Sequence, residues 1–75
     1  MPHVTIQHFP KDLTPKEKQV LADRLTAVIV EQLGTYEGAV SIALEPVDPA
    51  DWDATVHQPQ ISGRGHLLIK APEYR

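Results

Sequence analysis

Apolar and polar residues alternate in two short stretches of the chain. Between His3 and Phe9, one side carries Val4, Ile6 and His8, and the other carries His3, Thr5, Gln7 and Phe9. Between Ala39 and Glu45, one side carries Val40, Ile42 and Leu44, and the other carries Ala39, Ser41 and Ala43. A period of two residues is typical of half-buried β-strands, so we predict two strands, the first of which ends before Pro10.

The stretch between these strands has the period of a helix. Thr14 can cap the first turn, Pro15 suits the first helical position, and Glu17 completes a capping box. Gly34 suits the C-terminal cap. The predicted helix has one apolar stripe, made of Leu21, Leu25, Val28 and Ile29, with Val20 and Leu33 beside it.

A strand, a long helix and a second strand in this order predict a βαβ unit. Such a crossover makes the two strands parallel, with a right-handed connection. Because two strands alone are marginally stable, we expect the sheet to continue into a second subunit, with the helices on one face. The predicted fold class is α+β, with residues 1–75 forming a single domain that oligomerisation completes.

The C-terminal part of the chain has no clear period, because prolines and glycines interrupt it. The pair Asp48-Pro49 predicts a single capped turn that carries Trp52. The short apolar run Leu67-Leu68-Ile69, within His66–Lys70, is compatible with a strand or a helix, and we favour a short helix.

Composition limits the classes of function. A chain of 75 residues buries only about 60% of its unfolded surface, and without cysteine it has no disulfide to support it. We therefore expect a homo-oligomer, with a dimer favoured over a hexamer. The net charge of −3 argues against a nucleic acid or an anionic membrane as partner. The chain has no apolar run of membrane-spanning length and no secretory signal, which predicts a soluble cytoplasmic protein.

Pro2 is the leading candidate for a catalytic group. It follows Met1 directly, so removal of the methionine exposes a rigid secondary amine at the start of a strand. An apolar pocket disfavours the cationic amine and brings its pKa toward neutrality, where a general base works best. If Met1 is retained, however, the nitrogen of Pro2 is an amide without a basic lone pair, and Pro2 is only the start of a strand.

Several motifs together resemble 4-oxalocrotonate tautomerase-like proteins. They are Pro2-His3-Val4-Thr5-Ile6, His8-Phe9-Pro10-Lys11, Thr14-Pro15-Lys16-Glu17-Lys18-Gln19, Val40-Ser41-Ile42-Ala43-Leu44, Trp52 and Ile69-Lys70-Ala71-Pro72-Glu73-Tyr74. The resemblance covers nearly the whole chain and is nearest to the branch that acts on phenylpyruvate-like keto acids. It implies the βαβ fold and makes Pro2 the residue that moves a proton between two positions of the substrate.

The same resemblance implies a binding pocket. Trp52 takes the place of an aromatic wall, although a single tryptophan is equally often a core residue. Ser41 stands where dicarboxylate-type members carry an arginine, which indicates a monocarboxylate with an apolar tail. Lys11 is a candidate partner for the carboxylate or simply a solvated loop lysine, and Arg64 or Arg75 of a neighbouring subunit is an alternative.

No cofactor or metal is expected. His3 and His8 fall on opposite sides of the first strand, and His57 and His66 lie in irregular sequence, so no pair has the spacing of metal ligands. The predicted function is therefore a cofactor-independent keto–enol tautomerase acting on a small, aromatic or apolar 2-keto acid. Two alternatives remain open: hydration or dehalogenation of small unsaturated acids by the same proline, and a non-enzymatic oligomeric scaffold or binding protein.

Overall fold

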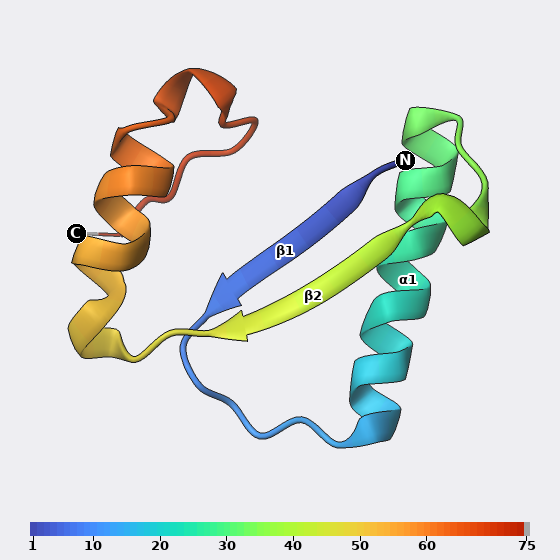
Figure 1. The fold of residues 1–75 in the computed structure, drawn as a ribbon, viewed down its shortest axis with the longest axis horizontal. Helices are drawn as coiled ribbons and strands as arrows, with labels where there is room; N and C mark the ends of the chain where they lie inside the picture. Colours follow the sequence, from blue (N-terminus) through green and yellow to red (C-terminus); the bar gives the residue numbers. More distant parts are fainter. Residues whose placement is uncertain (75) are drawn as a thin grey trace.

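The fold is a βαβ unit followed by a separate helical segment (Figure 1). A computed structural model describes residues 1–74. Strand β1, His3–His8, leads through a loop to helix α1, Pro15–Leu33, and strand β2, Ser41–Pro46, returns beside β1. The strands are parallel, and the register runs from His3 opposite Ser41 to His8 opposite Pro46. The predicted βαβ topology is confirmed.

Local signals in the sequence set both ends of α1. The Thr14 backbone N–H donates to Glu17 Oε1 at 2.9 Å, and the Glu17 N–H donates to Thr14 Oγ1 at 3.1 Å. At the other end Gly34 has φ of 65°, in the left-handed region that suits glycine, and its N–H donates to the Val30 carbonyl. The predicted caps are therefore confirmed at both ends.

The two faces of the sheet differ in polarity. Val4, Ile6, Ile42 and Leu44 are half-buried, and Ile42 and Leu44 face α1 across an open hollow. The opposite face carries two polar cross-strand pairs. Gln7 Nε2 donates to Glu45 Oε1 at 2.6 Å, and His3 Nδ1 lies 2.6 Å from Ser41 Oγ. One face of the sheet is thus apolar and turned toward α1, while the other is hydrogen-bonded and open to solvent.

Two predictions within this unit are wrong in detail. The second strand begins at Ser41 rather than Ala39, because residues Glu37–Ala39 form a short 3₁₀ turn, η1, that tucks Ala39 into the interior. Along α1, Leu21, Leu25 and Ile29 are half-buried as predicted, but Val28 is 57% exposed. Val20 and Leu33, which flank the predicted stripe, are also exposed, because the apolar surface of α1 is wider than the part that two strands cover.

The C-terminal segment lies beyond the carboxyl ends of the strands, away from α1 (Figure 1). Asp48 caps the 3₁₀ turn η2, Pro49–Asp51, and Trp52 follows directly, as predicted. Residues Asp53–Ser62 then form a π-helix, η3, which the sequence did not predict. The short helix expected within His66–Lys70 is a single 3₁₀ turn, η4, Gly65–Leu67, after which Leu68 is extended.

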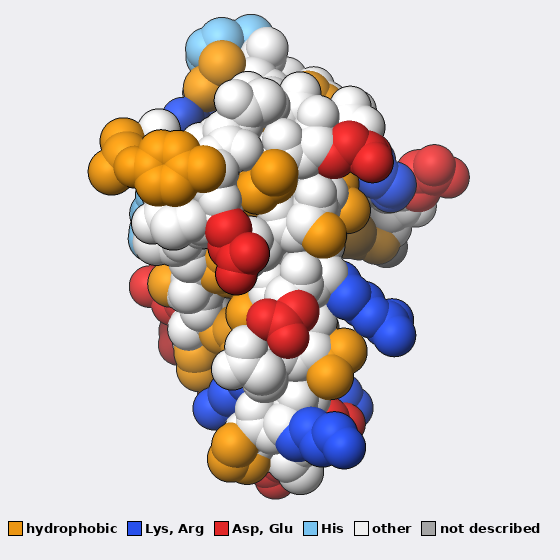
Figure 2. Space-filling view, turned by 90° about the vertical axis from the view of Figure 1, so that its right-hand side faces the viewer, with side chains coloured by type: hydrophobic (Ala, Val, Ile, Leu, Met, Phe, Trp, Pro, Cys, Tyr) orange, Lys and Arg blue, Asp and Glu red, His pale blue; other side chains and the backbone are white. Residues whose placement is uncertain are grey.

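A single copy of the chain encloses very little core. Among the described residues, only Ala39, Val47 and Val56 are buried hydrophobics. The accessible surface is 6078 Å², whereas a compact monomer of 8.3 kDa exposes about 4,600 Å². The radius of gyration is 14.0 Å, against about 11 Å for a compact domain of this length. Figure 2 shows the side that carries α1, where apolar side chains lie open to solvent among charged ones.

Candidate active site

Pro2 is fixed at the start of β1. Its carbonyl accepts a hydrogen bond from the Ser41 N–H at 3.2 Å, so the parallel ladder begins at this residue, and Pro2 is half-buried. Met1 projects from this position and is 94% exposed. The nitrogen of Pro2 therefore has a defined place, next to a methionine that is open to solvent.

Ser41 lies beside Pro2, as the prediction of a shared site requires. Its hydroxyl is 2.6 Å from His3 Nδ1, and His3 Nε2 is 3.2 Å from Thr5 Oγ1. These groups form a hydrogen-bonded row on the open face of the sheet. Ser41 can offer a hydroxyl to an anionic group, but it adds no charge to the site.

The other two predicted site residues, Lys11 and Trp52, are found at the opposite end of β1 from Pro2. Lys11 follows the strand in the loop to α1, and Trp52 packs edge-to-face on Phe9, with ring centroids 5.1 Å apart. At about 3.3 Å per residue, β1 separates the two ends by about 20 Å. A single copy of the chain therefore does not bring Lys11 and Trp52 together with Pro2.

Lys11 is placed near the start of α1. The pKa of the Glu17 carboxyl lies below its ordinary value, chiefly because the Thr14 backbone N–H donates to it, and the positive charge of Lys11 contributes in the same direction. Lys11 is exposed and does not line the pocket that contains Trp52. Its side chain remains available to an anion that approaches from solvent.

Trp52 belongs to an aromatic pocket of about 300 Å³, a size at the lower end of ligand sites. The pocket is lined by Phe9, Pro49, Trp52, Asp53, His57 and Tyr74. No site role was predicted for Phe9, His57 or Tyr74. Trp52 and His57 are five residues apart. Neither an α-helix nor a strand places two such residues on the same side, but the i to i+5 pattern of η3 does.

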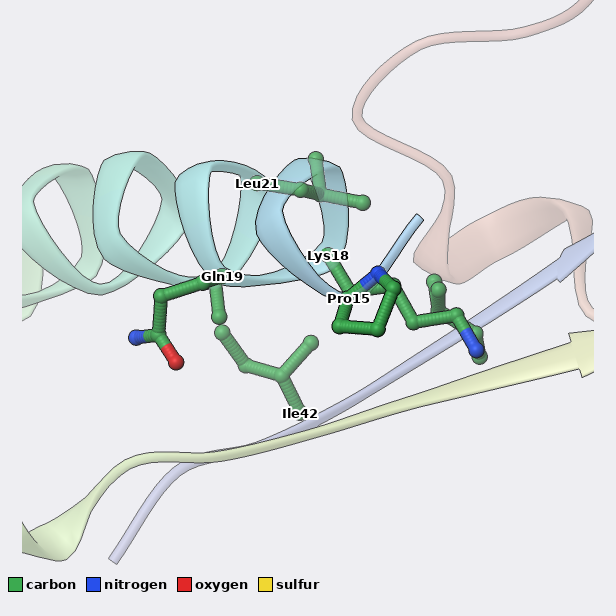
Figure 3. Close-up of a pocket in the computed structure, with 7 residues that line it drawn as sticks. Pro15, Lys18, Gln19, Leu21 and Ile42 are labelled. Atoms are coloured by element: carbon green, nitrogen blue, oxygen red, sulfur yellow. The ribbon is translucent and has the colours of Figure 1, made fainter. Parts of the chain in front are cut away.

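A second and larger hollow, of about 590 Å³, opens between α1 and β2 (Figure 3). Ile42 of β2 lies opposite the first turns of α1, and Pro15, Lys18, Gln19 and Leu21 of the helix also line the hollow. None of the predicted site residues lines this hollow. We interpret it as space between helix and sheet that one copy of the chain leaves unfilled.

The other candidates for binding the carboxylate are the two arginines of the C-terminal part of the chain. Arg64 Nη1 donates to Gln60 Oε1 at 3.3 Å within the C-terminal segment. Arg75 lies outside the described residues.

Residues 1–74 contain no group of three or more histidine, cysteine or acidic side chains arranged to hold a metal ion. The same part of the chain has no helix of the length and apolar character needed to cross a membrane.

The βαβ fold agrees with the one implied by the resemblance of the sequence to tautomerase-like proteins, and comparison with known proteins shows the family. The sequence model of the family described as "Tautomerase enzyme" matches residues 2–58. The chain belongs to the tautomerase family, and it is an enzyme of the isomerase class. Family membership favours the enzymatic interpretations of the sequence over a non-enzymatic scaffold.

Curated relatives cover almost the whole chain. Tautomerase PptA of Cronobacter sakazakii is 40% identical over 99% of this chain and 97% of its own length. Tautomerase PptA of Klebsiella pneumoniae is 43% identical with the same coverage. The crystal structure of DmpI from Helicobacter pylori aligns with a TM-score of 0.55 over 63% of this chain and 78% of that chain, at 22% identity, and supports the fold alone.

Proposed function

We propose that the chain is a cofactor-independent keto–enol tautomerase in which the nitrogen of Pro2, freed by removal of Met1, is the general base. The observation that carries the proposal is the position of Pro2. Its carbonyl is held in the ladder by the Ser41 N–H, while Met1 is almost fully exposed. Removal of Met1 would thus leave a secondary amine at a fixed point, whereas most chain termini are mobile.

The reaction requires one proton to move between two positions of the substrate. The neutral amine of Pro2 takes the proton from the enol oxygen or from the carbon next to the ketone, and the resulting ammonium returns it to the other position. The enolate formed in between needs a hydrogen-bond donor or a cation. Ser41, beside Pro2, and Lys11 are the groups of this chain suited to that role, and no redox or metal step is involved.

The substrate that we propose is a small aromatic or apolar 2-keto acid. The aromatic pocket around Trp52 matches a planar ring, because ring faces and edges pack well against each other. Ser41 adds no charge beside Pro2, which favours a substrate with one carboxylate over a dicarboxylate. Lys11 is the proposed partner of that single carboxylate.

We further propose that each active site is shared by two copies of the chain in a homodimer. About 20 Å separates Pro2 from Trp52 within one copy, which is longer than a small keto acid. When a two-fold axis perpendicular to the sheet relates two copies, their strands run antiparallel. Pro2 of one copy then lies next to the Phe9 and Trp52 end of the other, and the sheet gains two strands.

Pro2→Ala tests the proposed base. The variant keeps a terminal amine but loses the ring that fixes it, and we expect kcat/KM for phenylpyruvate to fall by about 10²-fold or more. Intact mass spectrometry of both proteins checks that Met1 is absent. The matched control is Pro10→Ala, at an exposed proline in the loop that follows β1, which should retain activity. An unchanged rate in Pro2→Ala, or an active enzyme that retains Met1, would refute Pro2 as the base.

A further inference from the structure

The C-terminal segment returns to η3 instead of extending into solvent. After η4 the chain has no regular structure from Leu68 to Tyr74, yet it runs back alongside η3 (Figure 1). Only one side chain of this return, that of Tyr74, lines the aromatic pocket. The contacts of Tyr74 therefore determine how this segment meets the pocket.

The hydroxyl of Tyr74 connects two side chains that lie five residues apart. Trp52 Nε1 donates to the Tyr74 hydroxyl at 3.3 Å, and the same oxygen is 2.9 Å from His57 Nδ1. An indole N–H can only donate, so the hydroxyl accepts from Trp52, and its own proton is free to bond to a neutral His57. The rings of His57 and Tyr74 also pack edge-on, with centroids 5.7 Å apart.

These contacts hold the indole of Trp52 from two directions. The Phe9 ring at the end of β1 packs against it at an interplanar angle of 86°, and the Tyr74 hydroxyl binds its N–H. Trp52 is only half-buried, so packing alone leaves it freedom to turn. A binding wall is effective when packing and hydrogen bonds from supporting residues fix its rotamer.

We propose that Tyr74 is a positioning residue. Its hydroxyl holds the C-terminal segment against η3 by hydrogen bonds and thereby fixes Trp52 as the wall of the aromatic pocket. Its action on the substrate, through Trp52, rests on the function proposed above. These hydrogen bonds do not involve the proton that the reaction transfers, so Tyr74 affects how the substrate ring is held and not the basicity of Pro2.

Tyr74→Phe removes the hydroxyl and keeps the ring. The chain has a single tryptophan, so its fluorescence reports on Trp52 alone. We expect the variant to show stronger quenching of this fluorescence by acrylamide, because an indole without the Tyr74 hydrogen bond is more accessible. For phenylpyruvate we expect KM to rise about 3- to 10-fold, the equivalent of one lost hydrogen bond, with kcat unchanged.

Tyr36→Phe is the matched control, because Tyr36 is the only other tyrosine and is 67% exposed outside the pocket. It should behave as the wild type in quenching and in KM. Equal quenching of Tyr74→Phe and the wild type would refute the proposal that Tyr74 holds Trp52. Raised quenching with an unchanged KM would refute the proposed effect of Tyr74 on substrate binding. If the wild type does not act on keto acids, the proposed function fails, while the quenching comparison still decides whether Tyr74 holds Trp52.

Discussion

Glu17 combines a hydrogen bond and a charge at the first turn of α1. Its carboxylate accepts from the Thr14 N–H while the Thr14 hydroxyl accepts from the Glu17 N–H. Because Pro15 has no N–H, these bonds pair two of the three free N–H groups of the helix start. These bonds, with the charge of Lys11, hold the pKa of Glu17 below its ordinary value. The charged form is therefore favoured in the folded chain over the unfolded one.

Glu17→Gln should remove the dependence of folding stability on pH that the Glu17 carboxyl causes. It should keep the capping box, since glutamine also serves at this position. A carboxyl whose pKa is lowered by folding adds stability that is full above its unfolded pKa of about 4.3 and is lost as the pH falls through the folded pKa. We expect wild-type stability to fall more steeply below about pH 5 than that of the variant. Urea unfolding followed by circular dichroism between pH 7 and 3 measures it.

The control for this comparison is Glu31→Gln. Glu31 is exposed near the other end of α1, where its carboxylate accepts from the neighbouring Gln32 side chain at 3.2 Å. This variant removes one carboxylate of the same helix without touching the cap. Equal pH profiles for the wild type and Glu17→Gln would contradict the effect that we assign to the capping box.

The predicted site residues were readable from the sequence to different degrees. Pro2 and Ser41 were assigned to one site by the family resemblance, and the register of the two strands, with His3 opposite Ser41, is seen in the structure. Trp52 could be placed after a capped turn, but its partner Tyr74 lies 22 residues further on, beyond several turns. No periodicity connects two such positions, so only the three-dimensional structure identifies the pair.

Element η3 depends on a close approach of the backbone at its end. The Gly63 N–H donates to the Gln58 carbonyl at 2.8 Å, which closes the last i to i+5 turn. A Cβ at Gly63 would lie 2.9 Å from the Pro59 carbonyl oxygen and 3.0 Å from that of Gln58. The φ of Gly63 is −70°, so glycine is needed here for space and not for an unusual backbone conformation.

Gly63→Ala is therefore expected to destabilise the C-terminal segment. Backbone carbonyls cannot move aside as flexible side chains do, and we expect a loss of about 1 to 3 kcal/mol in the free energy of unfolding. Gly65→Ala is the control, because a Cβ there meets nothing within 4 Å, and it should stay within about 0.5 kcal/mol of the wild type. Urea unfolding compares the variants, and equal stabilities would contradict the steric argument.

The elements differ in how far local sequence determines them. Helix α1 could be predicted because its caps and stripe follow α-helical spacing from Thr14 to Gly34. Element η3 could not, because a π-helix has no common sequence pattern and Pro59 within it suggests a break. The start of β2 was misplaced because Ala39 and Val40 continue the alternation of the strand, although the 3₁₀ turn η1 takes up Ala39.

At the scale of the whole molecule, the isolated chain is incomplete. Its accessible surface exceeds that of a compact monomer by about 1,500 Å², which is more than one partner buries in a standard interface. Leu33, Tyr36, Leu67 and Ile69 are more than half exposed. Surfaces of this size and character are those of obligate oligomers, which agrees with the proposal that two copies share each site.

A shared site can be tested by mixing two impaired variants. Pro2→Ala lacks the rigid proline amine, and Trp52→Ala lacks the wall of the pocket, so each alone should be strongly impaired. If Pro2 of one copy acts with Trp52 of the other, a mixed dimer has one site with both residues intact. Half of the dimers in an equal mixture are mixed, so re-assembly should restore about a quarter of the wild-type activity per chain.

Activity of the mixture that stays at the mean of the two variants would show that each site lies within one copy. Light scattering must give the same mass before and after re-assembly, a multiple of the 8.3 kDa of one chain, so that exchange of subunits is the only change. The control is Pro2→Ala re-assembled with itself, which should gain nothing. Restored activity would link the exposed apolar surface, the separation of Pro2 from Trp52 and the catalytic site to one assembly.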